Sequence, residues 1–114
     1  MRFESLEVWK RSARLSAEVY KYFALCKDFG FKDQITRSSL SIPSNIAEGY
    51  ERGSDKDTVR FLYYAKGSAA ELRSQIYIGI DIGYIEKNIG NQWIKETDEV
   101  SKMLRGLIQA FQNE

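Results

Sequence analysis

Histidine is absent from this 114-residue chain, and cysteine occurs once, at Cys26. Without histidine the chain cannot form a Ser-His or Cys-His nucleophilic pair, a His-ligated zinc site, or the Glu-x-x-His di-iron site found in four-helix bundles. A single cysteine cannot form an intramolecular disulfide, which favours a reducing compartment. Because Tyr22, Phe23 and Leu25 surround it, we interpret Cys26 as a small core residue rather than a nucleophile. We therefore predict that the protein is not an enzyme.

Glycine-rich phosphate loops and long apolar runs are also missing. Neither Gly-x-x-x-x-Gly-Lys nor Gly-x-Gly-x-x-Gly occurs, and no run approaches the roughly 20 apolar residues that a membrane span requires. The segment Arg2-Phe3-Glu4 has no apolar signal core. The net charge of +1 gives the chain as a whole no attraction to nucleic acid or anionic lipid. We expect a soluble cytoplasmic protein without cofactor, metal or membrane contact.

The first half of the chain has the apolar spacing of two helices. The first predicted helix spans residues 6–27 and carries more apolar positions than one bundle seam needs, so the excess either widens the core contact or faces a neighbouring subunit. Gly30 is expected to stop the first helix and form a short turn. The second helix then begins near Asp33 and ends at Gly53. Pro43 lies in its middle and removes one backbone hydrogen bond. The pattern therefore predicts either a kinked but continuous helix or two shorter pieces.

The second half predicts two more helices. Ser54-Asp55-Lys56-Asp57 is a capping sequence that opens a helix to about Ile82, and the last helix begins between Glu86 and Asn91. A row of residues recurs every seven positions along the first of these helices and just past its end: Tyr63, Ala70, Tyr77 and Tyr84. We expect this row to be the margin of the core, a subunit contact or a base-stacking surface. Four amphipathic helices with short loops predict an all-α, antiparallel up-down-up-down bundle that occupies residues 1–114 as one domain.

Two helix faces carry polar side chains at helical spacing, one on the second helix and one on the third. The six residues are Ser41, Asn45, Glu48, Ser68, Glu71 and Gln75. Unpaired buried polar groups cost about 1–3 kcal/mol each, so we predict that the two faces meet inside the bundle as a structural hydrogen-bond network. The alternative is a Glu48/Glu71 pocket that binds a small ligand or catalyses a reaction. Two glutamates without histidine make a poor metal site.

Basic residues exceed acidic ones by three over residues 1–80, and a local basic surface is the only electrostatic route to nucleic acid at this net charge. The candidate nucleic-acid contacts are Lys10, Arg11, Arg14, Lys21, Arg37 and Arg52. An oligomer would repeat such a surface and raise its avidity.

Four stretches resemble a known family: Ser41-Ile-Pro-Ser-Asn-Ile-Ala-Glu-Gly49, Gly67-Ser-x-x-Glu-Leu72, the opening Leu6/Val8/Trp9 and the corner Gly83-Tyr84. They are similar to the bacterial four-helix bundle proteins encoded in intervening sequences of 23S ribosomal RNA genes. The resemblance implies a continuous second helix and rings of five bundles. A related accessory protein of diversity-generating retroelements is a basic pentamer that partners a reverse transcriptase and binds nucleic acid. We therefore predict a homopentameric scaffold whose partners are itself and RNA, DNA or a nucleic-acid-processing protein.

Overall fold

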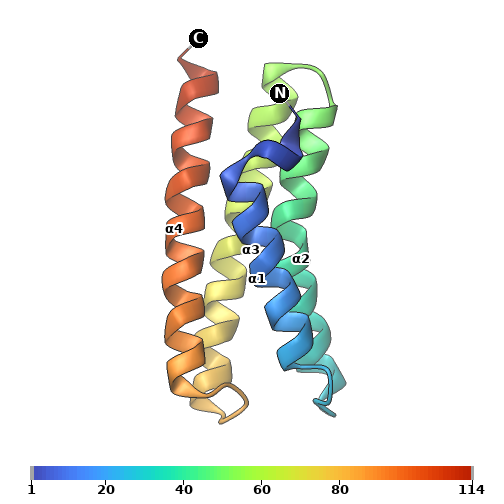
Figure 1. The fold of residues 1–114 in the computed structure, drawn as a ribbon, viewed down its shortest axis with the longest axis vertical. Helices are drawn as coiled ribbons and strands as arrows, with labels where there is room; N and C mark the ends of the chain where they lie inside the picture. Colours follow the sequence, from blue (N-terminus) through green and yellow to red (C-terminus); the bar gives the residue numbers. More distant parts are fainter. Residues whose placement is uncertain (1, 114) are drawn as a thin grey trace.

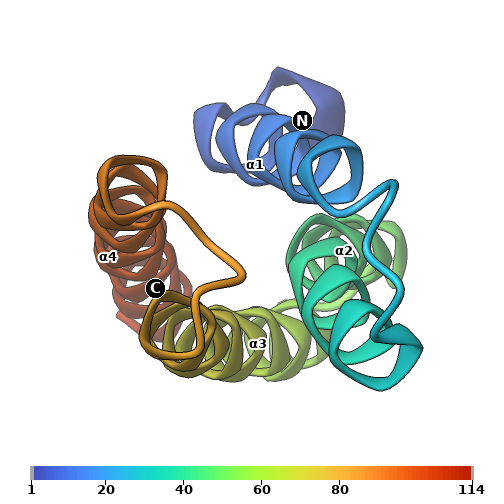
Figure 2. The same cartoon turned by 90° about the horizontal axis from the view of Figure 1, so that it is seen from below.

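The computed structural model describes residues 2–113, and in these residues it contains helices and no strands. A short 3-10 helix, η1 (Phe3–Ser5), precedes α1 (Glu7–Tyr22), α2 (Phe29–Glu51), α3 (Asp55–Asp81) and α4 (Lys87–Gln112). Consecutive helices run in opposite directions (Figure 1), and Figure 2 shows them in sequence order around a common centre. The bundle measures 45 × 20 × 20 Å. The predicted four-helix fold is confirmed.

The turn between the first two helices differs from its prediction. α1 ends at Tyr22 instead of residue 27, and α2 begins at Phe29 instead of near Asp33. Gly30 therefore lies in the first turn of α2 and does not act as a helix stop. The reason is Asp28, whose carboxylate accepts the backbone N–H of Phe31 at 3.1 Å and caps the helix.

α2 passes through Pro43 without a break, so the prediction of a continuous helix is confirmed. The hydroxyl groups of nearby serines donate to backbone oxygens one turn earlier, Ser38 to Ile35 at 3.2 Å and Ser39 to Thr36 at 2.8 Å. Such bonds favour bending of a helix. A kink at Pro43 stays a prediction.

The core contains apolar residues of all four helices. The apolar residues that recur every three or four positions along α3 are fully buried, with Leu62, Ala65, Ala69, Leu72 and Ile76 at 0% exposure. Ser54 caps this helix as predicted and accepts the N–H of Asp57 at 3.2 Å. At the far end of α4, Ile108 is buried while Leu107 is only half-buried.

α1 buries only one of its two apolar stripes. Val8, Leu15 and Val19 are in the core, whereas Trp9, Ala13, Ala17 and Tyr20 are half-buried or exposed. The apolar excess noted in the sequence is therefore at the surface of the bundle. No helix within residues 2–113 is long and apolar enough to span a membrane.

Candidate functional site

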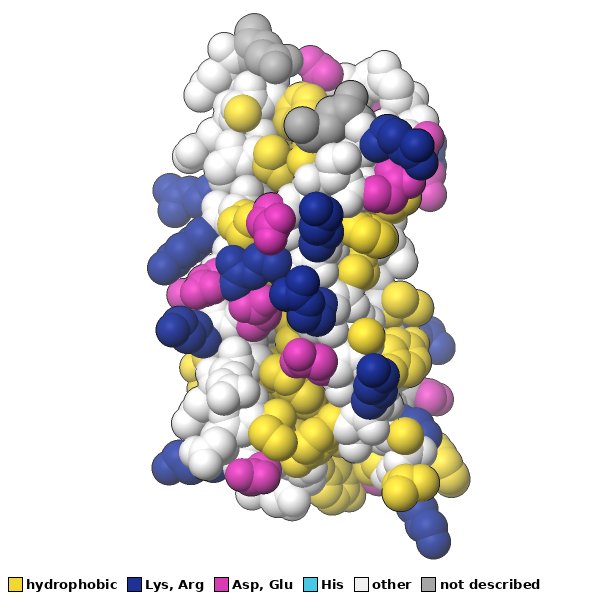
Figure 3. Space-filling view, in the orientation of Figure 1, with side chains coloured by type: hydrophobic (Ala, Val, Ile, Leu, Met, Phe, Trp, Pro, Cys, Tyr) yellow, Lys and Arg dark blue, Asp and Glu magenta, His cyan; other side chains and the backbone are white. Residues whose placement is uncertain are grey.

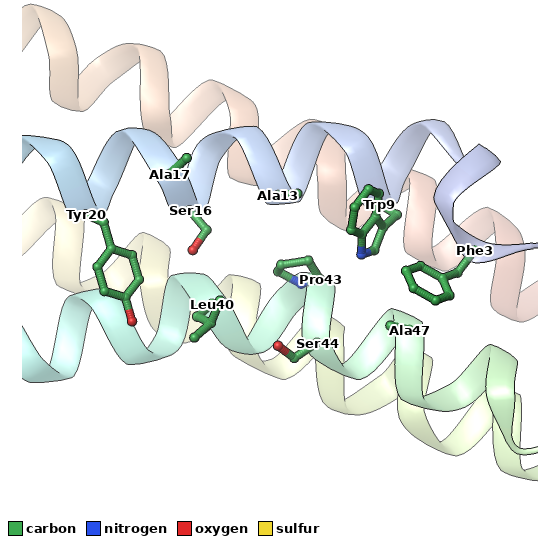
Figure 4. Close-up of a pocket in the computed structure, with 10 residues that line it drawn as sticks. All are labelled: Phe3, Trp9, Ala13, Ser16, Ala17, Tyr20, Leu40, Pro43, Ser44 and Ala47. Carbon is green, nitrogen blue, oxygen red and sulfur yellow. The ribbon is translucent and has the colours of Figure 1, made fainter.

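An apolar groove runs along the outer surface between α1 and α2 (Figure 4). Its volume is about 460 Å³. The wall from α1 carries the apolar stripe that the core leaves out, and α2 supplies the opposite wall. The lining residues are Phe3, Trp9, Ala13, Ser16, Ala17, Tyr20, Leu40, Pro43, Ser44 and Ala47.

The shape of the groove follows from residue size. Aromatic side chains lie at both ends, with Phe3 and Trp9 at one and Tyr20 at the other (Figure 4). The rings of Phe3 and Trp9 meet edge to face, with centroids 5.3 Å apart. Small side chains between them keep the floor open. Leu40 is 48% exposed and Tyr20 is 43% exposed, so both side chains leave apolar atoms open to solvent along the groove.

The groove offers an apolar contact surface and contains no charged side chain. Its two polar members are Ser16 and Ser44, and the Ser16 hydroxyl already shares a 3.1 Å hydrogen bond with that of Ser39 in α2. Burial of its exposed apolar atoms would contribute about 25 cal/mol per Å². An apolar partner fits this chemistry better than a charged substrate.

The polar network predicted between α2 and α3 does not form inside the bundle. Glu48 and Glu71 are exposed, and Ser41, Asn45, Ser68 and Gln75 are half-buried. The side-chain amide of Asn45 donates to the Ser41 carbonyl oxygen of its own helix at 2.8 Å. Gln75 does link the two helices, but its partner is the Ser38 hydroxyl, which donates to it. Apolar side chains fill the core positions of α2 and α3. The two polar faces therefore lie toward the solvent, outside the buried contact between the two helices.

The alternative of a Glu48/Glu71 pocket is also wrong. Both side chains are exposed, and Glu48 forms a 2.9 Å ion pair with Arg52 one turn later in α2. Neither glutamate lines the α1–α2 groove or the smaller pockets beside Trp93, Arg105 and Phe111.

Arg11 was predicted to contact nucleic acid, but the structure places it in an ionic link between α1 and α4. Its guanidinium donates to the carboxylates of Glu96, where one bond is 3.1 Å, and of Glu99. These bonds raise the pKa of Arg11 and lower that of Glu99. Figure 3 shows acidic and basic side chains intermixed along this side of the molecule. Arg11 is therefore a structural residue.

The other five candidate basic residues are divided between α1 and α2, with Arg52 directly after the last residue of α2. Lys10, Arg14, Lys21 and Arg37 are exposed on α1 and α2. Arg52 is paired with Glu48, and its guanidinium carbon lies 4.9 Å from the centre of the Phe61 ring. Two acids, Glu7 and Glu18, accompany the basic residues of α1.

Replacing Arg11 with methionine is expected to destabilise the bundle at neutral pH and to flatten its response to acid. The hydrogen bond from Arg11 lowers the pKa of Glu99 below its ordinary value of 4.5. A lowered folded-state pKa stabilises the fold above the unfolded value, and this contribution is lost as the pH falls through the folded value. Urea unfolding of wild type and Arg11→Met across pH 7 to below 4.5 measures the difference. Lys10→Met is the control, since Lys10 is exposed, and equal acid responses of Arg11→Met and wild type would contradict the assignment.

The sequence signalled the groove only indirectly. The apolar excess of the first helix was expected either to widen the core contact or to face a neighbouring subunit. Nothing indicated that Leu40, Pro43 and Ala47 would form the facing wall of a groove.

Comparison with known proteins agrees with this architecture. The family model described as 23S rRNA-intervening sequence protein matches residues 4–106. A crystal structure of a protein with unknown function from the S23 ribosomal protein family of Bacteroides thetaiotaomicron superposes with a TM-score of 0.82 and 27% sequence identity. The alignment covers 89% of this chain and 97% of that one. No curated protein matches the chain. With most of its length matched, the chain belongs to the family of 23S rRNA-intervening sequence proteins.

Proposed function

We propose that the protein is a non-catalytic cytoplasmic scaffold that works as a homo-oligomer, a ring of five bundles, and that a second copy of the chain packs into the α1–α2 groove. The uncharged groove carries the proposal. It exposes Tyr20 and Leu40, two apolar side chains that do not stabilise a monomer when they face solvent. Its small floor residues allow a helix of another bundle to approach closely. Homo-oligomers with closed symmetry are the commonest assemblies of soluble proteins.

A ring requires a second, different surface on each copy, because its contacts are head to tail. The outer side of α3 supplies a candidate. Tyr64, Ile78 and Ile82, the residue that directly follows α3, are each half-exposed. Their spacing of 14 and 4 residues places them on one side of the helix. We name this set the α3 ridge. An apolar ridge on one bundle complements an apolar groove on the next.

The mass of the native protein tests the scaffold directly. Multi-angle light scattering after size-exclusion chromatography is expected to give five times the 13.2 kDa of one chain, and that mass should hold over a tenfold dilution. A mass of one chain at every concentration would contradict the proposal. A mass of two chains would mean that the groove meets itself, which excludes the ring.

The scaffold would act by repetition. A ring displays each surface feature of the bundle five times, so contacts that are weak in one copy add to a strong interaction with an extended partner. RNA, DNA or a protein that processes them are the partners that we propose for the ring.

A further inference from the structure

The surface that α3 and α4 share on the side away from the groove is basic and aromatic. We call it the α3–α4 face and define it by Tyr63, Lys66, Arg73, Tyr77, Lys102 and Arg105. Figure 2 shows α1 and α2 on one side of the bundle, and α3 and α4 on the other. The side chains of Tyr63, Lys66 and Arg105 line a shallow pocket of about 200 Å³ together with Ile108, Gln109 and Gln112.

Charge is unbalanced on the α3–α4 face. Among the residues that the structure describes, the four basic residues of this face have one ion-pair partner, Asp98, which contacts Arg73 at 3.5 Å and Lys102 at 3.4 Å. Within residues 2–113, no carboxylate lies within 4.0 Å of the charged nitrogens of Lys66 or Arg105. The α1–α4 side differs, because its central arginine is held by two glutamates. The α3–α4 face therefore has cationic groups available for an anionic partner.

Two tyrosines flank the basic residues at a spacing that suits a chain-like ligand. Tyr63 is 51% exposed and Tyr77 is 53% exposed. Fourteen residues separate them, which is about 21 Å along the helix axis and places them on the same side of α3. Exposed aromatic rings beside a basic groove are the elements with which proteins bind single-stranded nucleic acid, since the rings stack on bases and the cations contact phosphates. A duplex hides its base faces and cannot use the tyrosines.

We infer that the α3–α4 face binds single-stranded nucleic acid, with Lys66, Arg73, Lys102 and Arg105 on the phosphates and Tyr63 and Tyr77 stacked on bases. The inference deepens the proposed scaffold, because the ring would present five such faces to one strand. It does not need the groove, so a neighbouring copy and a strand can bind one bundle at the same time.

Fluorescence anisotropy with a labelled 20-nucleotide strand of mixed sequence tests this inference. RNA, DNA of the same sequence and the DNA duplex are titrated at 50 and 200 mM salt. We expect saturable binding to one or both single strands that weakens at 200 mM salt, because bound phosphates release counterions. Lys66→Gln/Arg73→Gln/Arg105→Gln is expected to lower affinity at 50 mM salt by about tenfold or more. The control Lys10→Gln/Arg14→Gln/Lys21→Gln removes the same charge from α1 and should leave affinity within about twofold of wild type.

The tyrosines separate stacking from charge. Tyr63→Leu/Tyr77→Leu is expected to weaken binding by about fivefold or more for each ring, while Tyr63→Phe/Tyr77→Phe keeps the affinity because phenylalanine also stacks. As a control, light scattering and circular dichroism should show that each variant keeps the mass and helix content of wild type.

Four results would overturn the inference: no saturable binding at 50 mM salt, equal losses in the two glutamine triples, full affinity in the leucine pair, or a duplex bound as tightly as the single strands. The mass measurement remains independent. A monomer that binds strands would refute the ring and keep the face, whereas a pentamer that binds none would refute the face alone.

Discussion

Replacing Leu40 with glutamate is expected to convert the protein from an oligomer to a monomer. Leu40 lines the α1–α2 groove and is 48% exposed, so a carboxylate there remains hydrated in the free chain and the bundle still folds. In the assembled state the same carboxylate would be buried against apolar atoms without a partner, which costs several kcal/mol per ion. Light scattering should show the mass fall to that of one 13.2 kDa chain, with the helical circular dichroism spectrum retained.

Leu25→Glu is the matched control for Leu40→Glu. Leu25 lies outside the groove in the turn between α1 and α2 and is 92% exposed, so the same substitution there should leave the mass unchanged. An oligomer that survives Leu40→Glu would show that the groove is not the interface.

Mixing two variants tests whether the contact is head to tail. Leu40→Glu disables the groove, and Ile78→Glu disables the α3 ridge, so each variant alone should be monomeric. In the mixture, the Ile78→Glu variant supplies an intact groove and the Leu40→Glu variant supplies an intact ridge. The expected product is a heterodimer of the two variants. A mixture that stays monomeric would contradict the pairing of these two surfaces.

Gly49→Ala is expected to lower the free energy of unfolding by about 1–2 kcal/mol. A Cβ at Gly49 would lie 2.9 Å from the Cβ of Phe61 and 3.2 Å from the backbone oxygen of Thr58. Neither atom can move without a shift of α3, and overpacking of this kind costs about 1–3 kcal/mol. The better helix propensity of alanine returns part of this loss. Urea unfolding at a fixed protein concentration measures the change, since the stability of an oligomer depends on concentration.

Gly67→Ala is the control with the opposite sign. No atom outside the local helix lies within 4 Å of a Cβ built at Gly67, which is exposed in the interior of α3. The substitution should therefore raise the free energy of unfolding by about 0.5–1 kcal/mol, because alanine loses less backbone entropy than glycine. Equal effects at the two positions would show that helix propensity, and not close packing of α2 on α3, sets the requirement for glycine at position 49.

The prediction of helices succeeded where the signals were local. Ser54 was recognised as a cap, and the buried seam of α3 follows its 3- and 4-residue spacing. It failed at the turn between the first two helices, where the second helix was expected to begin near Asp33 and is capped by Asp28 instead. The cap of α2 became evident only from the bond between the Asp28 carboxylate and the Phe31 N–H.

The prediction of the site failed for a different reason. The spacing of Asn45, Glu48 and Glu71 correctly placed polar side chains on one side of each helix, but it could not tell an inner side from an outer one. Arg11 shows the same limit, because its partners Glu96 and Glu99 are more than 80 residues away in the sequence. A charge pattern read along the chain counts such an arginine as available.

The number and order of the helices, and the polar and apolar stripes on each, depend on residues within one or two turns of one another, so they could be predicted from the sequence. The packed bundle was needed to show which stripe of α1 enters the core, which stripe lines the groove with Leu40 and Pro43, and which cations lie on the α3–α4 face. These outcomes depend on the rotation and register of the packed helices, which follow from side-chain fit across the whole core. Helical periodicity places residues on a common side, and packing decides what that side meets.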